Sequence, residues 1–331
     1  MHPMRIVFFG TAELACASLE ALAAAPAFSL LGVVTQPDRP RGRDLRLQHS
    51  PVKASALRLG LTVLQPEKCR HPDFIQVIQS LRPDIGVVVA YGQILPPALL
   101  RIPPHGCVNV HASLLPKYRG AAPIQWAILN DEPETGVTIM QIDAGLDTGA
   151  ILSTEATRIL PDDDARTLHD RLARSGADLL VRTLPEHVSG RIEPRPQPEE
   201  GATYARKITK EDGRLDWNRP ARELWNRVRG LTPWPGTHAH LRSDPKPMLL
   251  KVHQASVRPG PRGAAGEILA ADRAGIIVAC GEGALCLTVV QREGGRRLTA
   301  AEFLAGHPLR PGQRFENLEA APSEPAGGSK V

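Results

Sequence analysis

The sequence has few cysteines and no long apolar run. Its five cysteines, an odd number, include no Cys-x-x-Cys pair: they are Cys16, Cys69, Cys107, Cys280 and Cys286. This usage argues against a disulfide framework and a zinc site, so we expect reduced thiols and no bound metal. No apolar stretch is long enough to cross a bilayer, and Gly10 and Glu13 interrupt any signal-peptide core. We therefore expect a cytoplasmic protein with no membrane partner.

The sequence also lacks a Gly-x-Gly-x-x-Gly motif. Gly10 stands alone after the apolar run of residues 5–9. A phosphate-binding turn of the dinucleotide type needs its further glycines for close backbone approach. No nucleotide cofactor is therefore expected, although the chain begins like a nucleotide-binding fold.

Strand-like and helix-like segments alternate along the N-terminal half. Strands are expected over residues 5–9, 30–34, 61–64, 85–90, 106–111, 136–142 and 150–159, and helices over 13–25, 51–59, 73–81 and 165–184. Such alternation predicts an α/β fold, a Rossmann-like and mostly parallel sheet covered by helices. Ligands of such sheets bind beyond the carboxyl ends of the strands, so we expect Gly10, Tyr91 and the segment 109–116 to meet there.

The length of 331 residues predicts two domains. Alternating prolines after residue 190 predict an extended linker, and short strands spaced by about ten residues follow it. The second domain is expected to be a smaller β-barrel or a sandwich. We predict a catalytic domain over 1–189, a linker over 190–208, the second domain over 209–316 and a disordered tail over 317–331.

Positive charge is concentrated in the second half. Residues 1–190 hold 18 Lys and Arg against 19 Asp and Glu, net −1, whereas residues 191–331 hold 22 against 16, net +6. A basic region attached to a near-neutral one suits a polyanion such as nucleic acid. A solvated surface explains a charge of this size equally well.

Three polar side chains stand in one stretch of roughly forty residues: Asn109, His111 and Asp147. Asn109 and His111 are two positions apart in an apolar run, so a strand places them on one face. Asp147 lies near two glycines that permit a sharp turn toward His111. An amide and an imidazole can stabilise the oxyanion formed when an amine attacks an acyl carbon, while a carboxylate orients the imidazole and favours its charged form.

Each of these residues alone is more often structural, as a core histidine, a turn cap or a loop carboxylate. The combination favours chemistry. Ser113 and Cys107 have no activating base at short spacing, so direct transfer between two substrates is expected instead of a covalent intermediate.

Four motifs resemble the formyltransferases that use 10-formyltetrahydrofolate. They are Asn109-x-His111, Ser113-Leu114-Leu115-Pro116-x-x-Arg119-Gly120-x-x-Pro123, Thr135-Gly136-Val137-Thr138 and Asp147-Thr148-Gly149. Further matches to the methionyl-tRNA formyltransferases of that superfamily extend over nearly the whole chain: Phe9-Gly10-Thr11, Thr35-Gln36-Pro37-Asp38-Arg39-Pro40 and Asn226-x-Val228-Arg229-Gly230-x-x-Pro233-Trp234-Pro235. The resemblance implies formyl transfer to methionine on initiator methionyl-tRNA, with Asn109, His111 and Asp147 as the catalytic residues.

The resemblance also implies two groups of folate contacts. They are Ser113, Leu114, Leu115 and Pro116, together with Val89, Ala90, Tyr91, Gly92, Ile94 and Leu95 around the pterin. Residues 87–90 would form a buried strand in any case. Backbone amides at its end are expected to pair with the pterin edge.

For tRNA, the resemblance implies contacts from the loop 36–47 and from the end of the linker. The expected contacts are Arg39, Arg41, Arg43, Arg46, Lys207 and Lys210, with Arg43 at the position of the family's key arginine. The second domain would be the family's OB-like barrel, which binds the acceptor arm. A solvated loop and a solvated linker remain the alternatives, and Trp234 is expected to be a packing anchor.

Two other functions stay open at this stage. A related enzyme would formylate a sugar-nucleotide amine or hydrolyse the formyl-folate, and the basic loop and second domain argue against it. A non-catalytic RNA-binding protein with this fold is the other alternative, and the complete set of Asn109, His111 and Asp147 argues against it. A monomer is the default expectation.

Overall fold

The computed structural model describes residues 2–41, 46–243, 245–259 and 263–317. The chain divides into two units, one of residues 1–127 and 132–207, the other of residues 128–131 and 208–331. Among the described residues, no helix is long and apolar enough to cross a membrane. Apart from Asn317, the predicted tail over 317–331 lies outside the described residues.

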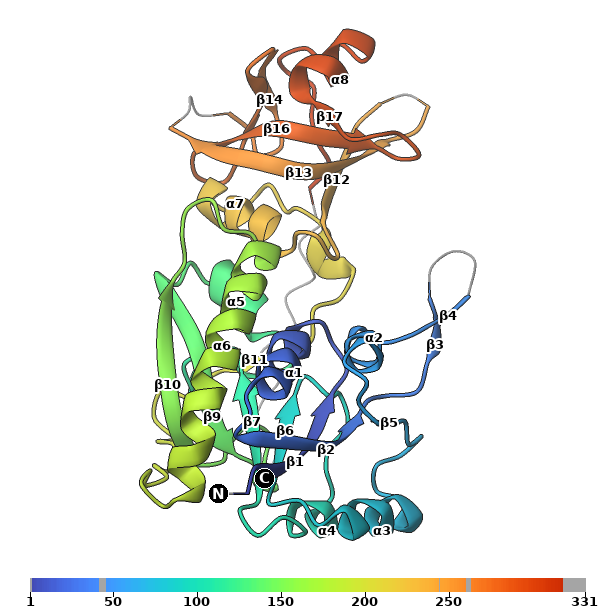
Figure 1. Ribbon diagram of the computed structural model, residues 1–331. Coiled ribbons are helices and arrows are strands. Elements are labelled where there is room, and N and C mark those ends of the chain that lie inside the picture. The colour runs from blue at the N-terminus through green and yellow to red at the C-terminus, as the bar shows by residue number, and fades with distance from the viewer. Residues whose placement is uncertain (1, 42–45, 244, 260–262, 318–331) are drawn as a thin grey trace, which may run out of the picture. The chain divides into compact units, whose positions relative to one another are not determined.

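A seven-stranded sheet forms the centre of the N-terminal unit (Figure 1). Its order is β10-β9-β7-β6-β1-β2-β5, and its strands are β1 (Met4–Gly10), β2 (Phe28–Val34), β5 (Val63–Leu64), β6 (Ile85–Val89), β7 (Cys107–His111), β9 (Glu134–Gln141) and β10 (Ile151–Arg158). The five strands β1, β2, β5, β6 and β7 pair in parallel, while β9 is antiparallel to its neighbours β7 and β10. The predicted Rossmann-like sheet is confirmed, and its order reverses between β1 and β6.

Helices cover both faces of this sheet. They are α1 (Leu14–Ala24), α2 (Pro51–Arg58), α3 (Pro72–Leu81), α4 (Pro97–Leu100) and α6 (Ala165–Val188), while Ala127 of α5 (Pro123–Leu129) packs with Tyr118 and Ala205 instead. Phe74 of α3 and Leu99 of α4 pack in one cluster with Phe9 and Val88, which are paired across β1 and β6. Helix α6 lies on the opposite face and brings Gly176 against β7 and β9. The face that carries Phe9 and Val88 is therefore the α3 side.

Two short strand pairs complete this unit. β3 (Arg39–Arg41) and β4 (Arg46–Gln48) form an antiparallel pair, and β8 (Arg119–Gly120) pairs in parallel with β11 (Tyr204–Ala205). The segment expected as a linker runs along the unit: Arg195 exchanges two backbone hydrogen bonds with Ile151 before β11 is reached. It is consequently held to the N-terminal unit at two points, at β10 and at β8.

The C-terminal unit is built on an antiparallel sheet of order β12-β13-β16-β15-β14, with β17 paired to β16. Its elements are η1 (Glu211–Gly213), α7 (Ala221–Gly230), β12 (Thr237–Leu241), β13 (Met248–Arg258), β14 (Ile268–Asp272), β15 (Gly275–Ala279), β16 (Ala284–Arg292), β17 (Leu298–Thr299) and α8 (Ala300–Gly306). The segment Arg314 to Phe315 bridges the two edges, pairing with Leu241 of β12 and with Glu267 before β14. These bridges close the sheet, as the predicted barrel requires.

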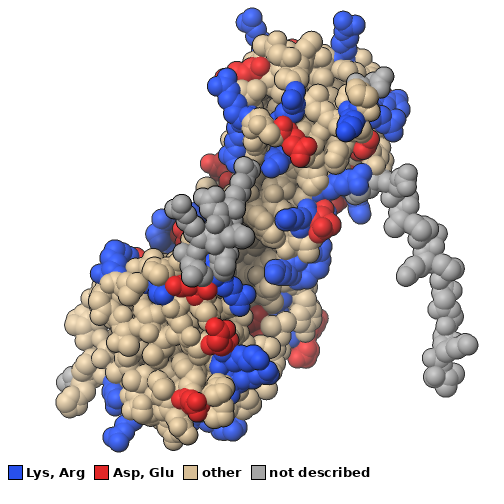
Figure 2. Space-filling model, turned by 90° about the vertical axis from the view of Figure 1, so that its right-hand side faces the viewer, with Lys and Arg blue, Asp and Glu red and all other residues tan. Residues whose placement is uncertain are grey.

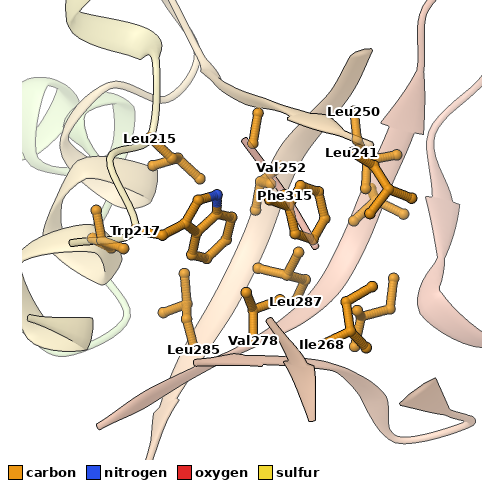
Figure 3. Close-up of a cluster of buried hydrophobic side chains, with 14 of the residues drawn as sticks. Leu215, Trp217, Leu241, Leu250, Val252, Ile268, Val278, Leu285, Leu287 and Phe315 are labelled. Carbon is orange, nitrogen blue, oxygen red and sulfur yellow. The ribbon is translucent and has the colours of Figure 1, made fainter. Parts of the chain in front are cut away.

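Apolar side chains fill the inside of this sheet (Figure 3). Trp217 is fully buried, and its ring centroid lies 5.0 Å from that of Phe315. Leu250, Leu285 and their neighbours surround this pair. The two aromatic rings thus anchor the segment that closes the sheet.

Candidate active site

Strand β7 presents two polar side chains on the α3 side of the sheet. Val110 points to α6, where a Cβ added to Gly176 would lie 3.0 Å from its Cγ1. Side chains alternate along a strand, so Asn109 and His111 point the other way. Asn109 is paired with Val88 of the α3-side cluster. The predicted shared face is confirmed.

The loop between β9 and β10 folds back to bring Asp147 to these side chains. A Cβ on Gly149 would lie 1.8 Å from the Gln141 carbonyl oxygen, and one on Gly145 would lie 2.0 Å from Thr148 Oγ1. Asp147 itself has φ 53°, a conformation that Asp tolerates better than most residues. Close packing therefore requires these two glycines, while Asp147 itself takes the left-handed conformation of the turn.

The Asp147 carboxylate meets both strand residues. Asn109 Nδ2 donates to Oδ1 at 3.4 Å, and His111 Nδ1 lies 3.6 Å from Oδ2. His111 Nε2 lies 2.9 Å from the Tyr118 carbonyl oxygen, which can only accept, so Nε2 carries a hydrogen. The imidazole is buried and held with Nδ1 toward Asp147. The structure thus brings the three predicted residues together.

This arrangement suits direct acyl transfer. Asn109 supplies N–H donors for a developing oxyanion, and a protonated His111 supplies one at Nδ1, because its Nε2 hydrogen is engaged by the Tyr118 carbonyl. Asp147 supplies a proton acceptor. The Ser113 hydroxyl donates to the Lys117 carbonyl at 2.6 Å and has its hydrogen engaged. Burial raises the pKa of the Cys107 thiol to about 12, so it stays protonated. Neither residue is set up as a nucleophile.

The segment after β7 is a compact turn. Thr138 of β9 donates to the Ser113 carbonyl at 2.7 Å and accepts from the Leu115 amide at 3.1 Å. Ser113 and Leu115 are buried, whereas Leu114 and Pro116 are half-buried. Only the last two therefore offer side-chain surface to a folate.

The loop after β6 places three of its expected folate contacts in the core. Val89, Tyr91 and Leu95 are buried, and the Tyr91 ring packs edge-on against Phe9 at 5.6 Å. Burial raises the pKa of the Tyr91 phenol above its ordinary value. What Tyr91 offers near the strand end is its backbone, not its ring.

The other three expected contacts of this loop are exposed. Ala90 has φ 44° and Gly92 has φ 84°, so the backbone turns outward there. Ile94 is 90% exposed, which is unusual for a large apolar side chain. These three residues form the accessible part of the loop.

A polar network that the sequence did not point to holds this loop. Gln36 Nε2 and Thr11 Oγ1 both donate to the Tyr91 carbonyl, at 3.0 and 2.8 Å. A Cβ at Gly92 would lie 2.5 Å from Gln36 Nε2. Glycine at 92 therefore keeps the space that this glutamine occupies.

The expected tRNA contacts of the 36–47 loop are only partly described. Arg39 is exposed at the start of β3, and Arg41 pairs with Arg46 across β3 and β4, where the backbone alone is described. Arg43 lies outside the described residues. The base of the pair is fixed by Asp38, which accepts from Lys53 at 2.7 Å.

Lys207 and Lys210, at the end of the expected linker, are both exposed. Figure 2 shows Lys and Arg side chains spread over the drawn face of the C-terminal unit, among fewer Asp and Glu side chains. Both lysines are therefore accessible to a polyanion.

Two residues near Asp147 were not expected from the sequence. The Gly120 amide donates to Asp147 Oδ2 at 2.8 Å, and the Gln197 side chain donates to the backbone carbonyls of Asp147 and Gly149. In the part of the chain that the structure describes, no group of three or more His, Cys, Asp or Glu side chains could hold a metal ion.

Two family models match the chain. The model "Formyl transferase" matches residues 4–184, and the model "Formyl transferase, C-terminal domain" matches residues 207–308. A methionyl-tRNA formyltransferase of Citrifermentans bemidjiense is 51% identical over 321 residues, 97% of this chain and 99% of that protein.

Solved structures with lower identity share the fold. An N-formyltransferase from Helicobacter canadensis, in complex with folinic acid and dTDP-3-aminofucose, has a TM-score of 0.62 at 18% identity over 86% of this chain and 99% of its own. HypX from Aquifex aeolicus, in complex with tetrahydrofolic acid, has a TM-score of 0.58 at 17% identity over 92% of this chain. The match spans 47% of the HypX chain.

Proposed function

Because the chain belongs to the formyl transferase family, and within it to the methionyl-tRNA formyltransferases, we propose that it formylates initiator methionyl-tRNA. The formyl donor is 10-formyltetrahydrofolate, and the acceptor is the free α-amino group of the esterified methionine. The observation that carries the proposal is the Asp147 carboxylate within 3.6 Å of both Asn109 and His111.

In the proposed reaction the amine attacks the formyl carbon and a tetrahedral intermediate forms. Asn109 Nδ2 and Nδ1 of the protonated His111 donate hydrogen bonds to its oxyanion. Asp147 holds His111 and accepts the proton that the amine loses, directly or through water. The bond from the formyl carbon to folate N10 then breaks, and that nitrogen takes the proton that Asp147 accepted, directly or through water, which returns Asp147 to its carboxylate form.

The folate is proposed to lie along the exposed backbone at Ala90 and Gly92, the side chain of Ile94, and the turn that contains Leu114 and Pro116. The first and last of these segments follow β6 and β7, which are neighbouring parallel strands. Their carboxyl ends share one edge of the sheet, where ligands of this fold class bind. The proposed chemistry needs no metal and no nucleotide.

The tRNA is proposed to be bound by basic residues outside the reacting centre. Arg39, Arg41, Arg43 and Arg46 would meet the acceptor end, and Lys207 and Lys210 would contact phosphates. We assign catalysis to residues 1–189, the linker to 190–208 and tRNA binding to 209–316, whose charge matches a polyanion. A cytoplasmic monomer is sufficient for this function.

The test is a formylation assay with methionine-charged initiator and elongator tRNAs, with 10-formyltetrahydrofolate present or omitted. Formylated methionine is expected on the initiator tRNA, only when the donor is present. Incorporation into neither tRNA contradicts the proposal. Formate release without an amine acceptor would indicate a hydrolase, and tRNA binding without folate turnover would indicate a binding protein.

A further inference from the structure

A partly buried amide supports the loop that carries Asp147. Gln197 Nε2 donates to the carbonyl oxygens of Asp147 and Gly149, each at 2.8 Å. Its Oε1 accepts from Arg119 Nε at 3.1 Å and from Arg119 Nη2 at 2.9 Å. Both hydrogens of the amide are used, and two carbonyls and a guanidinium leave it one possible orientation.

Arg119 is an unusual residue for this place. It is 1% exposed, and within the described ranges its nearest carboxylate is that of Glu199, 3.9 Å from Nη1 and itself 90% exposed. A buried guanidinium costs free energy unless its N–H groups are hydrogen-bonded. An apolar side chain would fill the same space without that cost, so stability alone does not explain Arg119.

Arg119 and its neighbour Gly120 act on the Asp147 loop from one strand, β8. The Gly120 amide donates directly to the carboxylate at 2.8 Å, while Arg119 reaches the loop backbone through Gln197. Gly120 has φ 115°, and a Cβ there would lie 2.8 Å from the Ala205 carbonyl oxygen of β11. β8 is therefore closely fixed before it contacts the loop.

The distances at the reacting centre make the loop position important. Asp147 lies 3.4 Å from Asn109 Nδ2 and 3.6 Å from His111 Nδ1, at the outer limit of hydrogen bonding. A small displacement of the loop would lengthen both contacts together. Misplacement of a reacting group by about 1 Å can cost about a hundredfold in rate.

We propose that Arg119 and Gln197 are positioning residues for formyl transfer, which fix the Asp147 carboxylate against His111 and Asn109 through the loop backbone. This inference rests on the proposed function. It also makes the segment before β11 a part of the active site, although its composition predicts a linker.

The test compares Gln197→Met, Gln197→Glu and the control Thr183→Val in steady-state formylation of initiator methionyl-tRNA. Gln197→Met keeps the size of the side chain and removes its hydrogen bonds with Arg119 and with the two loop carbonyls. Gln197→Glu keeps the oxygen that accepts from Arg119. It places a second carboxylate oxygen, in place of the NH₂ donor, opposite the carbonyl oxygens of Asp147 and Gly149. Thr183 is buried in the same unit and bonds Ser153 and Leu179, so Thr183→Val removes buried hydrogen bonds away from Asp147.

Both Gln197 variants are expected to lower kcat about tenfold to a hundredfold, with KM for donor and tRNA within about twofold. Thr183→Val is expected to lower the unfolding midpoint and leave kcat unchanged. Wild-type kcat in Gln197→Met, or an equal kcat loss in Thr183→Val, would overturn the positioning role.

A double-mutant cycle with Asp147→Asn separates this inference from the proposed function. If Gln197 acts through Asp147, adding Gln197→Met to Asp147→Asn changes kcat by less than about twofold. Multiplicative losses would refute that route. If Asp147→Asn loses turnover while the Gln197 variants keep the wild-type kcat, only the positioning role is rejected. If Asp147→Asn itself keeps normal turnover, the proposed mechanism is rejected.

Discussion

Two regions of the N-terminal unit, both proposed to meet the substrates, are built differently. Around Asp147, strand β7, strand β8 and the segment before β11 all contribute hydrogen bonds to one carboxylate and its loop. The β3–β4 pair, which carries the arginines, is a separate two-stranded element. Asp38 lies at its base and accepts a hydrogen bond from Lys53. Acyl transfer needs donors fixed to within fractions of an ångström, whereas phosphate binding needs charge and reach.

Replacing His111 by Ala is expected to have the largest effect on kcat. The substitution changes only the region around Asp147. The variant loses a donor to the oxyanion, so kcat should fall about a hundredfold to a thousandfold. Affinity for tRNA should stay within about twofold, because the basic residues are unchanged. Single-turnover formylation and tRNA binding at one salt concentration measure the two quantities. Near-normal turnover would rule out the proposed role of His111.

The triple variant Arg39→Ala, Lys207→Ala and Lys210→Ala probes three proposed phosphate contacts, one on the β3–β4 pair and two at the end of the linker. Loss of three phosphate contacts should weaken tRNA binding by about tenfold and lower the slope of log affinity against log salt by about two to three. The kcat at saturating tRNA should be unchanged, opposite to the His111→Ala result. Arg174→Ala, which removes an exposed cation from α6, is the control. A lower kcat with an unchanged salt slope would contradict the division between the regions.

The sequence predicts some parts of the fold and of the candidate site, and misses others. The alternation of apolar segments predicted the parallel sheet, and the spacing of Asn109 and His111 predicted their common face; the structure confirms both. Strand β12 was not predicted, because Thr237, His238 and His240 give a weak apolar pattern. Its strand conformation comes from pairing with β13, a tertiary effect.

The support of Asp147 could not be predicted. Gln197 lies 50 residues from Asp147 in a proline-rich segment whose composition indicates an extended linker. The Gly120 contribution is a backbone amide, which side-chain chemistry does not reveal. Tyr91 illustrates the same limit, since the backbone turn at Ala90 puts its ring into the core instead of the site.

Asp38→Asn should loosen the base of the β3–β4 pair and have a moderate effect. The hydrogen bond from Lys53, assisted by Gln65 and His49, lowers the pKa of Asp38 to about 2. The carboxylate therefore stabilises the fold above its ordinary pKa near 4, and this contribution is lost as the pH falls from about 4 to about 2. Urea unfolding at pH 7 should give a lower midpoint for the variant, and the difference should close toward pH 2.

Asp178→Asn serves as the control for that experiment, because it removes an exposed carboxylate from α6. Its midpoint should follow the wild type at every pH. A difference between Asp38→Asn and wild type that stays constant down to pH 2 would mean that the Asp38 charge does not hold the pair. The kcat of Asp38→Asn should remain near the wild-type value, because Asp38 belongs to the separate β3–β4 element.

Cys107→Ala should have the smallest effect on turnover. It tests whether the region around Asp147 needs a thiol for catalysis. Cys107 shares the face of β7 with Asn109 and His111, but it is 4% exposed, and burial raises its pKa to about 12. Its sulfur packs against Gly86, where an added Cβ would lie 2.5 Å from Sγ. The variant should lose about 1 kcal/mol of unfolding free energy through the small cavity and keep kcat within about twofold. A large loss of kcat at unchanged stability would instead point to a thiol intermediate. The Cys107 thiol would then act as a nucleophile. That result would contradict direct transfer of the formyl group between the two substrates.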